Sequence, residues 1–141
     1  MTLEGHTDFV WSLALLSNDR LASSSKDKTI KIWNTQNGLC LHTLTGHSGS
    51  VRGIAALDND ILASSSDDQT IKLWNVNTGL HIKTLLNNTG NVNKLVIFSN
   101  GTLLASNSFD SIDFSIKIWE LASTSVVRNL YGHTNSVNII E

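Results

Sequence analysis

The chain has 141 residues, of which 40% are hydrophobic and 16% are charged, and its net charge is −2. Without a run of like charge it lacks an electrostatic footprint for nucleic acid or for an anionic membrane, so neither partner is expected. Its single cysteine, Cys40, excludes an intrachain disulfide. The first ten residues lack the basic and apolar segments of a leader, and no stretch approaches about 18 uninterrupted apolar residues. We therefore expect a soluble chain in the cytoplasm, with the nucleus as the alternative.

Taken in chain order, the sequence is an internal repeat. The stretch ASSSKDKTIKIWN at 22–34 returns as ASSSDDQTIKLWN at 63–75, which is 41 residues later. A valine follows each of the segments GHTDF, GHSGS, NNTGN and GHTNS, in steps of 41, 41 and 45 residues, at Val10, Val51, Val92 and Val137. A tryptophan precedes each later valine by 18 residues, at Trp33, Trp74 and Trp119. Both intervals define one repeating unit.

Each unit is predicted to hold four short strands. In the second unit these are VRGIAAL at 51–57, ILASSS at 61–66, TIKLWNV at 70–76 and LHIKTLL at 80–86. The connections contain Asp, Asn and Gly, which favour tight turns, and connections this short join antiparallel neighbours. Each unit should therefore fold as an antiparallel meander.

Both faces of such a sheet carry large apolar groups. In the third strand of the second unit, alternation sends Ile71 and Leu73 to one face and Lys72 and Trp74 to the other. A sheet that is apolar on both faces must be covered on both, and stacking of neighbouring units does this, with the lysine stem lying along the packed surface. A period of about 41 residues with four strands per unit predicts an all-β fold of radially arranged blades.

The combination of Gly-His, Ala-Ser, a turn aspartate and a tryptophan followed by a polar residue, at this spacing, resembles the WD-repeat (WD40) family of β-propellers. The resemblance covers three units and the opening of a fourth. The dipeptide that names the family reads Trp33-Asn34, Trp74-Asn75 and Trp119-Glu120, so its second position differs in every unit. The resemblance implies a partial β-propeller with three four-stranded antiparallel blades, at about 6–45, 47–86 and 88–131, and the first strand of a fourth blade at 132–141.

Three blades and a fragment do not close a ring, because propellers typically have four to eight blades. Both ends resemble cuts in a longer array: TLEGH at 2–6 matches TLTGH at 43–47, and SVNII at 136–140 lies inside an expected first strand. Three explanations stay open, namely a fragment of a larger protein, a truncated gene product, or a chain that completes a ring by self-association through exposed blade faces.

The serine, histidine and aspartate of each unit could be taken for a hydrolase triad. Two observations argue against this: the set recurs from unit to unit, which would give several sites without a shared cleft, and no Gly-x-Ser-x-Gly elbow is present. The resemblance instead implies a buried hydrogen-bonded tetrad in each blade. Its members would be His6, Ser23, Asp27 and Trp33 in the first unit, and His47, Ser64, Asp68 and Trp74 in the second. The sequence leaves open which of the adjacent serines takes part.

The third unit departs from this pattern. Asn87 and Asn88 replace Gly-His, so the tetrad that contains Trp119 should be incomplete. Three extra residues follow the second strand, and either Asp110 or Asp113 could fill the aspartate position.

A metal site is not expected, and neither is a cofactor. The histidines of Gly-His, at His6, His47 and His133, occur once per blade, and the remaining ones, His42 and His81, lie in the outermost strands. No unit has two histidines at a spacing that is typical of metal ligands, such as His-x-x-x-His.

The face that WD-repeat proteins often use for partners holds the turn before the first strand and the turn between the second and third strands. The matching positions flank the recurring valine or precede the turn aspartate: Phe9, Trp11 and Lys26; Ser50, Arg52 and Asp67; Asn91, Asn93 and Phe109; Ser136 and Asn138. From these we select as protein-binding candidates Phe9, Trp11, Lys26, Arg52, Asp67, Asn93 and Phe109. Tryptophan and arginine are enriched in binding hot spots. The alternative is that Trp11 and Phe9 cover the end of an incomplete or crowded core.

The sequence therefore predicts a non-catalytic interaction scaffold that presents loops to protein or peptide partners. The alternative is an enzyme on a propeller scaffold, such as a quinone-cofactor dehydrogenase or a hydrolase. An enzyme would need ionisable residues that converge in a channel or cleft, and the turns offer Asp, Lys and Asn without a His or Glu pair. A substrate receptor of a ubiquitin ligase would be a special case of the scaffold.

Overall fold

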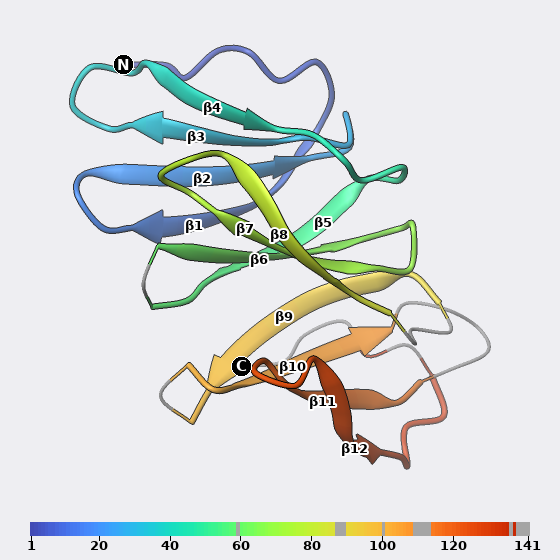
Figure 1. Cartoon of the computed structure of the whole chain (residues 1–141). Coiled ribbons are helices and arrows are strands. Elements are labelled where there is room, and N and C mark those ends of the chain that lie inside the picture. Colours follow the sequence, from blue (N-terminus) through green and yellow to red (C-terminus); the bar gives the residue numbers. More distant parts are fainter. Residues whose placement is uncertain (59, 87–89, 100, 109–113, 136, 138–141) are drawn as a thin grey trace.

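The computed structural model describes residues 1–58, 60–86, 90–99, 101–108, 114–135 and 137. These residues form three four-stranded antiparallel sheets without a helix (Figure 1). The strands are β1 Val10–Leu16, β2 Arg20–Ser25, β3 Ile30–Asn34, β4 Cys40–Leu44, β5 Val51–Ala56, β6 Ile61–Ser66, β7 Ile71–Asn75, β8 Leu80–Leu85, β9 Val92–Phe98, β10 Leu103–Ser108, β11 Ile116–Glu120 and β12 Ser125–Leu130. The predicted all-β fold is confirmed.

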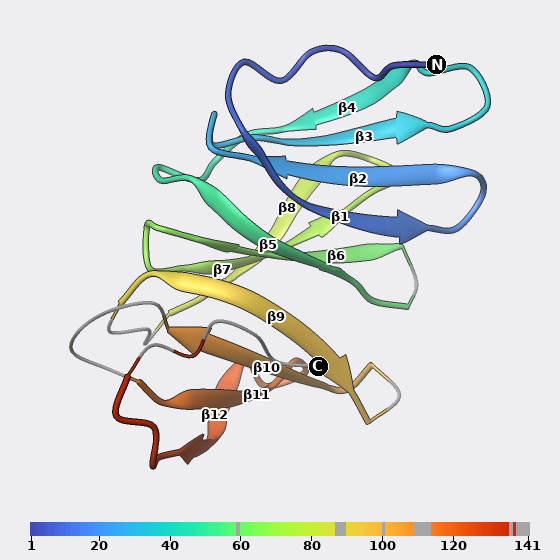
Figure 2. The ribbon, with the colours of Figure 1, turned by 180° about the vertical axis from the view of Figure 1, so that it is seen from behind.

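Each sheet is a meander in which the strands pair in sequence order. We name the sheets blade 1 (β1–β4), blade 2 (β5–β8) and blade 3 (β9–β12). The first strands lie side by side, with β5 between β1 and β9, and the second, third and fourth strands follow outward (Figures 1 and 2). The predicted start of a fourth blade falls on 132–141, of which 136 and 138–141 lie outside the described residues.

The blades pack through a repeated set of apolar residues. Between blades 1 and 2 the buried side chains are Ala22, Ile30, Ile32 and Leu44 on one side and Val51, Ile54, Leu62, Trp74 and Val76 on the other. Between blades 2 and 3 the equivalent positions hold Ala63, Ile71, Leu73 and Leu85 against Val92, Leu95, Leu104 and Trp119. The same residue pattern therefore builds both interfaces.

The exposed face of blade 1 shows how much this stacking buries. Val10 is 50% exposed, whereas Val51, its equivalent in blade 2, is 0% exposed; Leu13 is 62% exposed, whereas Ile54 is 7% exposed. Full burial of one such side chain contributes roughly 1.5–3 kcal/mol, so contacts between blades are the main stabilising term of the fold.

Among the residues that the structure describes, the far face of blade 3 is also apolar and partly exposed. A hollow of about 450 Å³ there is lined by Phe98, Leu103, Ile118, Val127, Arg128 and Leu130. An apolar face of this kind is typical of an interaction surface. The self-association through exposed blade faces stays a prediction.

The glycines of the first two Gly-His pairs are favoured by conformation and by space. Gly5 and Gly46 have φ values of +149° and +145°, which disfavour any side chain. A Cβ atom would also lie 3.3 Å from the ring of Trp33 or of Trp74, respectively. A larger residue at either position would therefore force the backbone or the tryptophan ring to shift where the chain crosses the ring.

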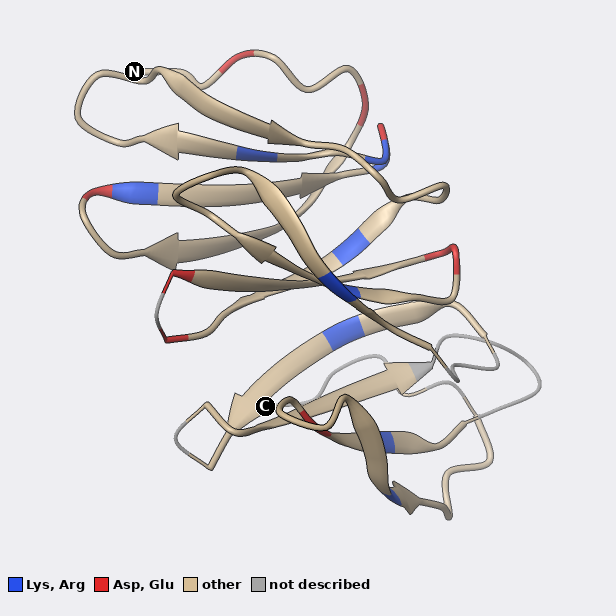
Figure 3. Cartoon of the chain, in the orientation of Figure 1, with Lys and Arg blue, Asp and Glu red and all other residues tan. Residues whose placement is uncertain are grey.

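Acidic residues lie mostly at turns rather than on the packed faces (Figure 3). One of them, Asp60, joins blade 2 to blade 1 at the end opposite the Gly-His connections. The buried Arg20 donates from Nη2 to Asp60 Oδ1 at 2.7 Å and from Nη1 to Asn77 Oδ1 at 2.6 Å. Hydrogen bonds from Asn77, Arg20 and Ser17 hold the pKa of Asp60 below its ordinary value of 3.8. This polar link therefore favours the ionised carboxylate.

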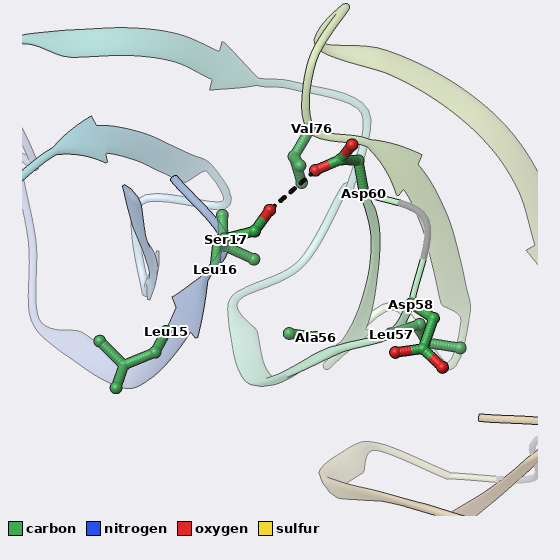
Figure 4. Close-up of a pocket in the computed structure, with 8 residues that line it drawn as sticks. All are labelled: Leu15, Leu16, Ser17, Ala56, Leu57, Asp58, Asp60 and Val76. Carbon is green, nitrogen blue, oxygen red and sulfur yellow. Dashed lines mark hydrogen bonds between the residues drawn. The ribbon is translucent and has the colours of Figure 1, made fainter. Parts of the chain in front are cut away.

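A cavity of about 310 Å³ lies beside this link, between blades 1 and 2. Its lining combines apolar side chains of both blades with polar groups: Leu15, Leu16, Ser17, Ala56, Leu57, Asp58, Asp60 and Val76 (Figure 4). Ser17 points across it and donates its hydroxyl to Asp60 Oδ1 at 3.1 Å. The polar link and the apolar core thus hold the two blades together at the same place.

Blades 2 and 3 approach each other closely at Gly53 on β5. A Cβ atom at this position would lie 2.7 Å from the backbone oxygen of Asn93 and 2.8 Å from Ser65 Oγ. Ser65 Oγ itself bonds to the backbone oxygens of Gly53 and Asn93, each at 3.3 Å. Absence of a side chain at residue 53 therefore sets the spacing between β5 and β9.

Gly53→Ala should lower the free energy of unfolding by about 1–3 kcal/mol, because the added methyl group pushes β9 away from β5. Denaturant titration followed by tryptophan fluorescence measures this change. The control is Ser12→Ala at the equivalent position of β1, where the wild-type residue already carries a Cβ atom. Equal midpoints for the two variants would mean that β5 and β9 are not packed this closely.

Candidate protein-interaction surface

The four polar residues of the first repeat form one chain of hydrogen bonds. Trp33 Nε1–H donates to Ser23 Oγ at 2.8 Å, and Ser23 Oγ lies 2.7 Å from His6 Nε2. His6 Nδ1 lies 2.8 Å from Asp27 Oδ2. Because the carboxylate can only accept, Nδ1 carries the proton, and Nε2 accepts the hydroxyl proton of Ser23. Every donor in this group therefore has an acceptor.

Asp27 closes the chain by accepting several bonds at once. Burial on its own would raise the pKa of Asp27. Hydrogen bonds from the Thr29 hydroxyl, from His6 and from the N–H groups of Thr7 and Thr29 outweigh burial and hold the pKa well below its ordinary value of 3.8. The carboxylate thus fixes the turn between β2 and β3 and the connection before β1.

Blade 2 repeats the arrangement with nearly the same distances. Trp74 Nε1–H donates to Ser64 Oγ at 2.7 Å, Ser64 Oγ lies 2.8 Å from His47 Nε2, and His47 Nδ1 lies 2.7 Å from Asp68 Oδ2. Thr70 donates its hydroxyl to Asp68 at 2.7 Å. In both blades the serine that takes part is the one directly after the alanine.

Blade 3 keeps the tryptophan and the serine. Trp119 Nε1–H donates to Ser106 Oγ at 2.8 Å. Asn87 and Asn88 at the Gly-His position, and Asp110 and Asp113 at the turn, lie outside the described residues. The expected incomplete tetrad of this blade therefore stays a prediction.

The geometry of serine, histidine and aspartate matches that of a hydrolase triad, yet its surroundings do not suit catalysis. Ser64 is fully buried, and its oxygen already accepts the indole N–H of Trp74. In blade 1 the group borders a hollow of about 170 Å³ whose other lining residues are apolar, namely Leu3, Val10, Leu13 and Leu21. A nucleophile needs access to substrate, which the buried Ser64 lacks, and the hydroxyl of Ser23 is likewise engaged by the indole of Trp33.

The predicted contact residues lie where the first strands begin and the second strands end, at the right of Figure 1. Backbone bonds join these two segments in blades 1 and 2: Lys26 N–H donates to Phe9 O at 2.8 Å, and Asp67 N–H donates to Ser50 O at 3.0 Å. The structure therefore brings together six of the candidates, which we call the contact face: Phe9, Trp11, Lys26, Arg52, Asp67 and Asn93. The seventh, Phe109, and the positions 136 and 138 lie outside the described residues.

Three members of the contact face occupy β-bulges. The pairing of β1 with β2 skips Trp11, the pairing of β5 with β6 skips Arg52, and the pairing of β9 with β10 skips Asn93. A bulged residue is released from the ordinary alternation of a strand, and its side chain is re-aimed. Equivalent bulges in three neighbouring strands thus direct three different side chains to one place.

Trp11 and Arg52 form the centre of the contact face. Arg52 Cζ lies 4.8 Å from the centroid of the Trp11 ring, a cation–π contact between blades 1 and 2. Asp67 holds the same guanidinium by two bonds, to Nε at 2.8 Å and to Nη2 at 3.0 Å. Trp11 stays 46% exposed, so the indole is held in place while much of it faces solvent.

Phe9 and Lys26 extend this centre along blade 1. The rings of Phe9 and Trp11 are 6.2 Å apart, and Lys26 Nζ lies 5.4 Å from the centroid of Phe9. Lys26 is also 3.7 Å from Asp8 Oδ2. Phe9 is 67% exposed, and whether it covers the end of an incomplete core stays an alternative.

A hollow of about 200 Å³ lies next to the indole, where the first strands of the three blades meet. It is lined by Trp11, Ser12, Arg52, Gly53, Asn93 and Lys94. Sequence reasoning missed Ser12, Gly53 and Lys94. Each of them directly follows a predicted contact position, which was the signal available in the repeat.

Other kinds of site receive no support from the part of the chain that the structure describes. That part holds no cluster of three or more His, Cys, Asp or Glu side chains that could bind a metal ion. It also contains no helix with the length and apolar character needed to cross a membrane.

The stacked four-stranded sheets and their repeated hydrogen-bonded group define the class of protein as a partial β-propeller. The chain belongs to the WD40 family: the model of the WD domain, G-beta repeat, matches residues 1–34, 38–75 and 79–120. The second match runs from β4 to β7 and the third from β8 to β11. The repeat of the sequence is therefore offset by one strand from the blade.

Curated relatives match over single repeats. Protein transport protein sec13 of Aspergillus oryzae is 50% identical over 38 residues, 24% of this chain and 13% of that protein. F-box/WD repeat-containing protein 7 of Drosophila melanogaster is 44% identical over 41 residues, 29% of this chain and 3% of that protein. WD repeat-containing protein pop1 of Schizosaccharomyces pombe is 46% identical over 41 residues, 29% of this chain and 5% of that protein. The matches thus span a small part of each relative.

His47→Ala should lower the free energy of unfolding by about 1–3 kcal/mol, because Ser64 and Asp68 lose a partner inside the blade. Urea titration measures the change. His133→Ala is the matched control, since His133 belongs to a Gly-His pair but is exposed. An equal loss of stability in both variants would mean that the hydrogen-bonded tetrad does not stabilise the blade.

Asp68→Asn should weaken the acid sensitivity of the fold. Burial would raise the pKa of Asp68, but hydrogen bonds from His47, from the Thr70 hydroxyl and from the N–H of Ser48 outweigh burial and hold this pKa below its ordinary value of 3.8. A carboxylate whose pKa is lowered on folding stabilises the fold above its unfolded pKa, and this contribution is lost as the pH falls through the folded value.

The measurement is the free energy of unfolding at neutral pH and below about pH 3. Wild type should lose more stability over this range than Asp68→Asn. Asp58→Asn, which changes an exposed carboxylate, should behave as wild type. An unchanged pH dependence in Asp68→Asn would contradict the account.

Proposed function

We propose that this chain is a non-catalytic interaction scaffold whose contact face binds a protein or peptide partner. Membership of the WD40 family supports the scaffold role in general terms. The observation that carries the particular surface is the indole of Trp11, half-exposed and held by Arg52, which Asp67 fixes in turn. A rigid aromatic group loses little conformational entropy on binding, so such a group is well suited to anchor a partner.

The variation between repeats also supports this surface. The equivalent bulge positions hold Trp11, Arg52 and Asn93. The tetrad positions, in contrast, hold a serine and a tryptophan in each blade. Different side chains at equivalent places make a surface that is not symmetric. An asymmetric surface can select one orientation of a peptide.

The enzyme alternative has little physical basis in this chain. A hydrolase would have to use a serine that is buried and already bonded to a tryptophan, such as Ser64. A quinone-cofactor dehydrogenase would need ionisable groups converging on the hollow, whose charged residues are Arg52 and Lys94. The Asp67 carboxylate beside Arg52 is held by two hydrogen bonds from that guanidinium. Acid–base catalysis needs a base that is free to accept a proton.

The names of the relatives refer to protein transport and to an F-box protein. Because each match covers one repeat, we assign neither role to this chain. Its location in the cytoplasm or the nucleus stays a prediction.

Trp11→Ala and Arg52→Ala should each reduce capture of a partner by more than about tenfold, since central aromatic and arginine residues dominate binding energy. Quantitative affinity capture with wild type and the two variants measures this. Tyr131→Ala removes an aromatic group that is more exposed than Trp11 and follows the outer strand β12, so it should leave capture unchanged. Partners that bind all four chains equally would show that binding does not use the contact face.

A further inference from the structure

The two interfaces between blades differ at the end of the sheets opposite the contact face. Between blades 1 and 2, the guanidinium of the buried Arg20 fills this end. It donates to Ser17 O at 3.0 Å, to Ser17 Oγ at 3.2 Å, to Asp60 Oδ1 at 2.7 Å and to Asn77 Oδ1 at 2.6 Å. The first interface therefore contains a complete guanidinium site, with acceptors from both blades.

The same four positions carry other side chains in the second interface. By the register of the second strand with the third, Arg20 corresponds to Ile61. The positions of the residues that bind the guanidinium, Ser17, Asp60 and Asn77, are held in the same order by Asp58, Thr102 and Ala122. Blade 2 thus presents an isoleucine to blade 3 where blade 1 presents a guanidinium to blade 2.

A hollow of about 460 Å³ lies at this place between blades 2 and 3. All four substituted positions line it, and apolar side chains form most of the remaining wall, namely Leu57, Leu73, Ile82 and Leu121. The volume falls within the range of roughly 300–1,000 Å³ that is usual for ligand sites. The second interface therefore has room for a side chain that the chain itself does not supply.

The Asp58 carboxylate has no matching charge beside it at the inner end of this hollow, near β5. It makes no hydrogen bond or ion pair in the part of the chain that the structure describes. A Cβ atom on Gly101 would lie 3.3 Å from Asp58 Oδ2, so the carboxylate faces blade 3. Figure 4 shows it apart from the bond between Ser17 and Asp60. A cation bound in the second interface would therefore meet a free carboxylate.

Lys83 is the other charged residue of the lining, and it lies at the outer end. It is exposed on β8 and pairs with Leu73, which pairs with Ala63 on β6. Two strand spacings of about 4.8 Å each therefore separate Lys83 from β6. Coulomb energy falls inversely with distance, so this ammonium repels a cation at the inner end less than half as strongly as a carboxylate in contact attracts it. The inner end thus favours a cation.

We infer that the hollow between blades 2 and 3 binds an arginine side chain of a protein partner, as a second interaction site at the end opposite the contact face. The guanidinium donates to the Asp58 carboxylate, and its aliphatic stem packs on Ile61 and the other apolar side chains. Thr102 donates its own hydroxyl proton to Ser99 O at 2.7 Å, so its oxygen is left to accept as well.

Arginine suits this site better than lysine. A guanidinium is a planar fork that serves several acceptors at once, as Arg20 does in the first interface. An ammonium is a compact charge that is more strongly hydrated, so it gains less from a hollow with apolar walls. The site is separate from the contact face and does not rest on the proposed function.

The test uses the full chain and a displayed library of random short peptides. Peptides are selected on wild type and counter-selected on Asp58→Asn, which removes the charge and keeps the size of the side chain. The remaining peptides should be enriched in arginine over the unselected library. For such a peptide, replacing its arginine by citrulline, a neutral isostere, should weaken binding to wild type by about fivefold, the effect expected of a partly exposed ion pair.

Three variants localise this effect. Asp58→Asn should bind the arginine and citrulline peptides equally weakly. Glu4→Gln also replaces an exposed carboxylate by an amide, near the N-terminus, and should preserve the fivefold difference. Ile61→Arg gives the second interface the residue that fills the first, and should abolish binding of the arginine peptide.

Each other outcome would overturn the inference. Peptides that distinguish wild type from Asp58→Asn without enrichment in arginine would show that the hollow takes a different ligand. Undiminished binding after replacement of the arginine by lysine would show that the site does not recognise a guanidinium. An equal effect of citrulline on wild type and Asp58→Asn, or a library without any peptide that survives counter-selection, would show that Asp58 does not bind a cation of a partner.

Discussion

A single buried serine hydroxyl joins the parts of each complete blade. In blade 2, Ser64 Oγ accepts from Trp74 on the third strand and donates to His47 in the connection before the first strand. Three net hydrogen bonds of about 1 kcal/mol each are comparable with burial of one or two isoleucines, so packing between blades dominates the stability. The hydroxyl chiefly determines arrangement, because its partners would be buried and unpaired in any other position.

This constraint separates the residues that build the blade from those that face a partner. The hydrogen-bonded tetrad fixes the turn after the second strand through Asp68. Asp67, the residue before it, holds Arg52 against Trp11. Bulges at the start of each first strand then aim different side chains at one hollow. Neighbouring residues of the same turn therefore give a geometry that repeats from blade to blade and a surface that differs between blades.

The repeat predicted most of the fold because its signals are local. Turn residues at fixed spacing placed the strands of the second unit, and the tetrad partners share one register in both complete repeats. The bulges were missed, although they leave a mark in the alternation of apolar residues. Val51 and Ile54 are three positions apart and enter the same core, so one extra residue lies between them. The link from Arg20 to Asp60 was also missed, since it joins residues 40 positions apart in different blades.

The indole N–H groups report on both halves of this account in one experiment. Hydrogen exchange of the four tryptophans, followed by NMR, should show strong protection for Trp33, Trp74 and Trp119, whose N–H groups donate to buried serines. The N–H of Trp11, on a half-exposed side chain, should exchange rapidly. Exchange of the Trp74 N–H as fast as that of Trp11 would contradict its buried hydrogen bond to Ser64. Protection of the Trp11 N–H would contradict the solvent exposure of the contact face.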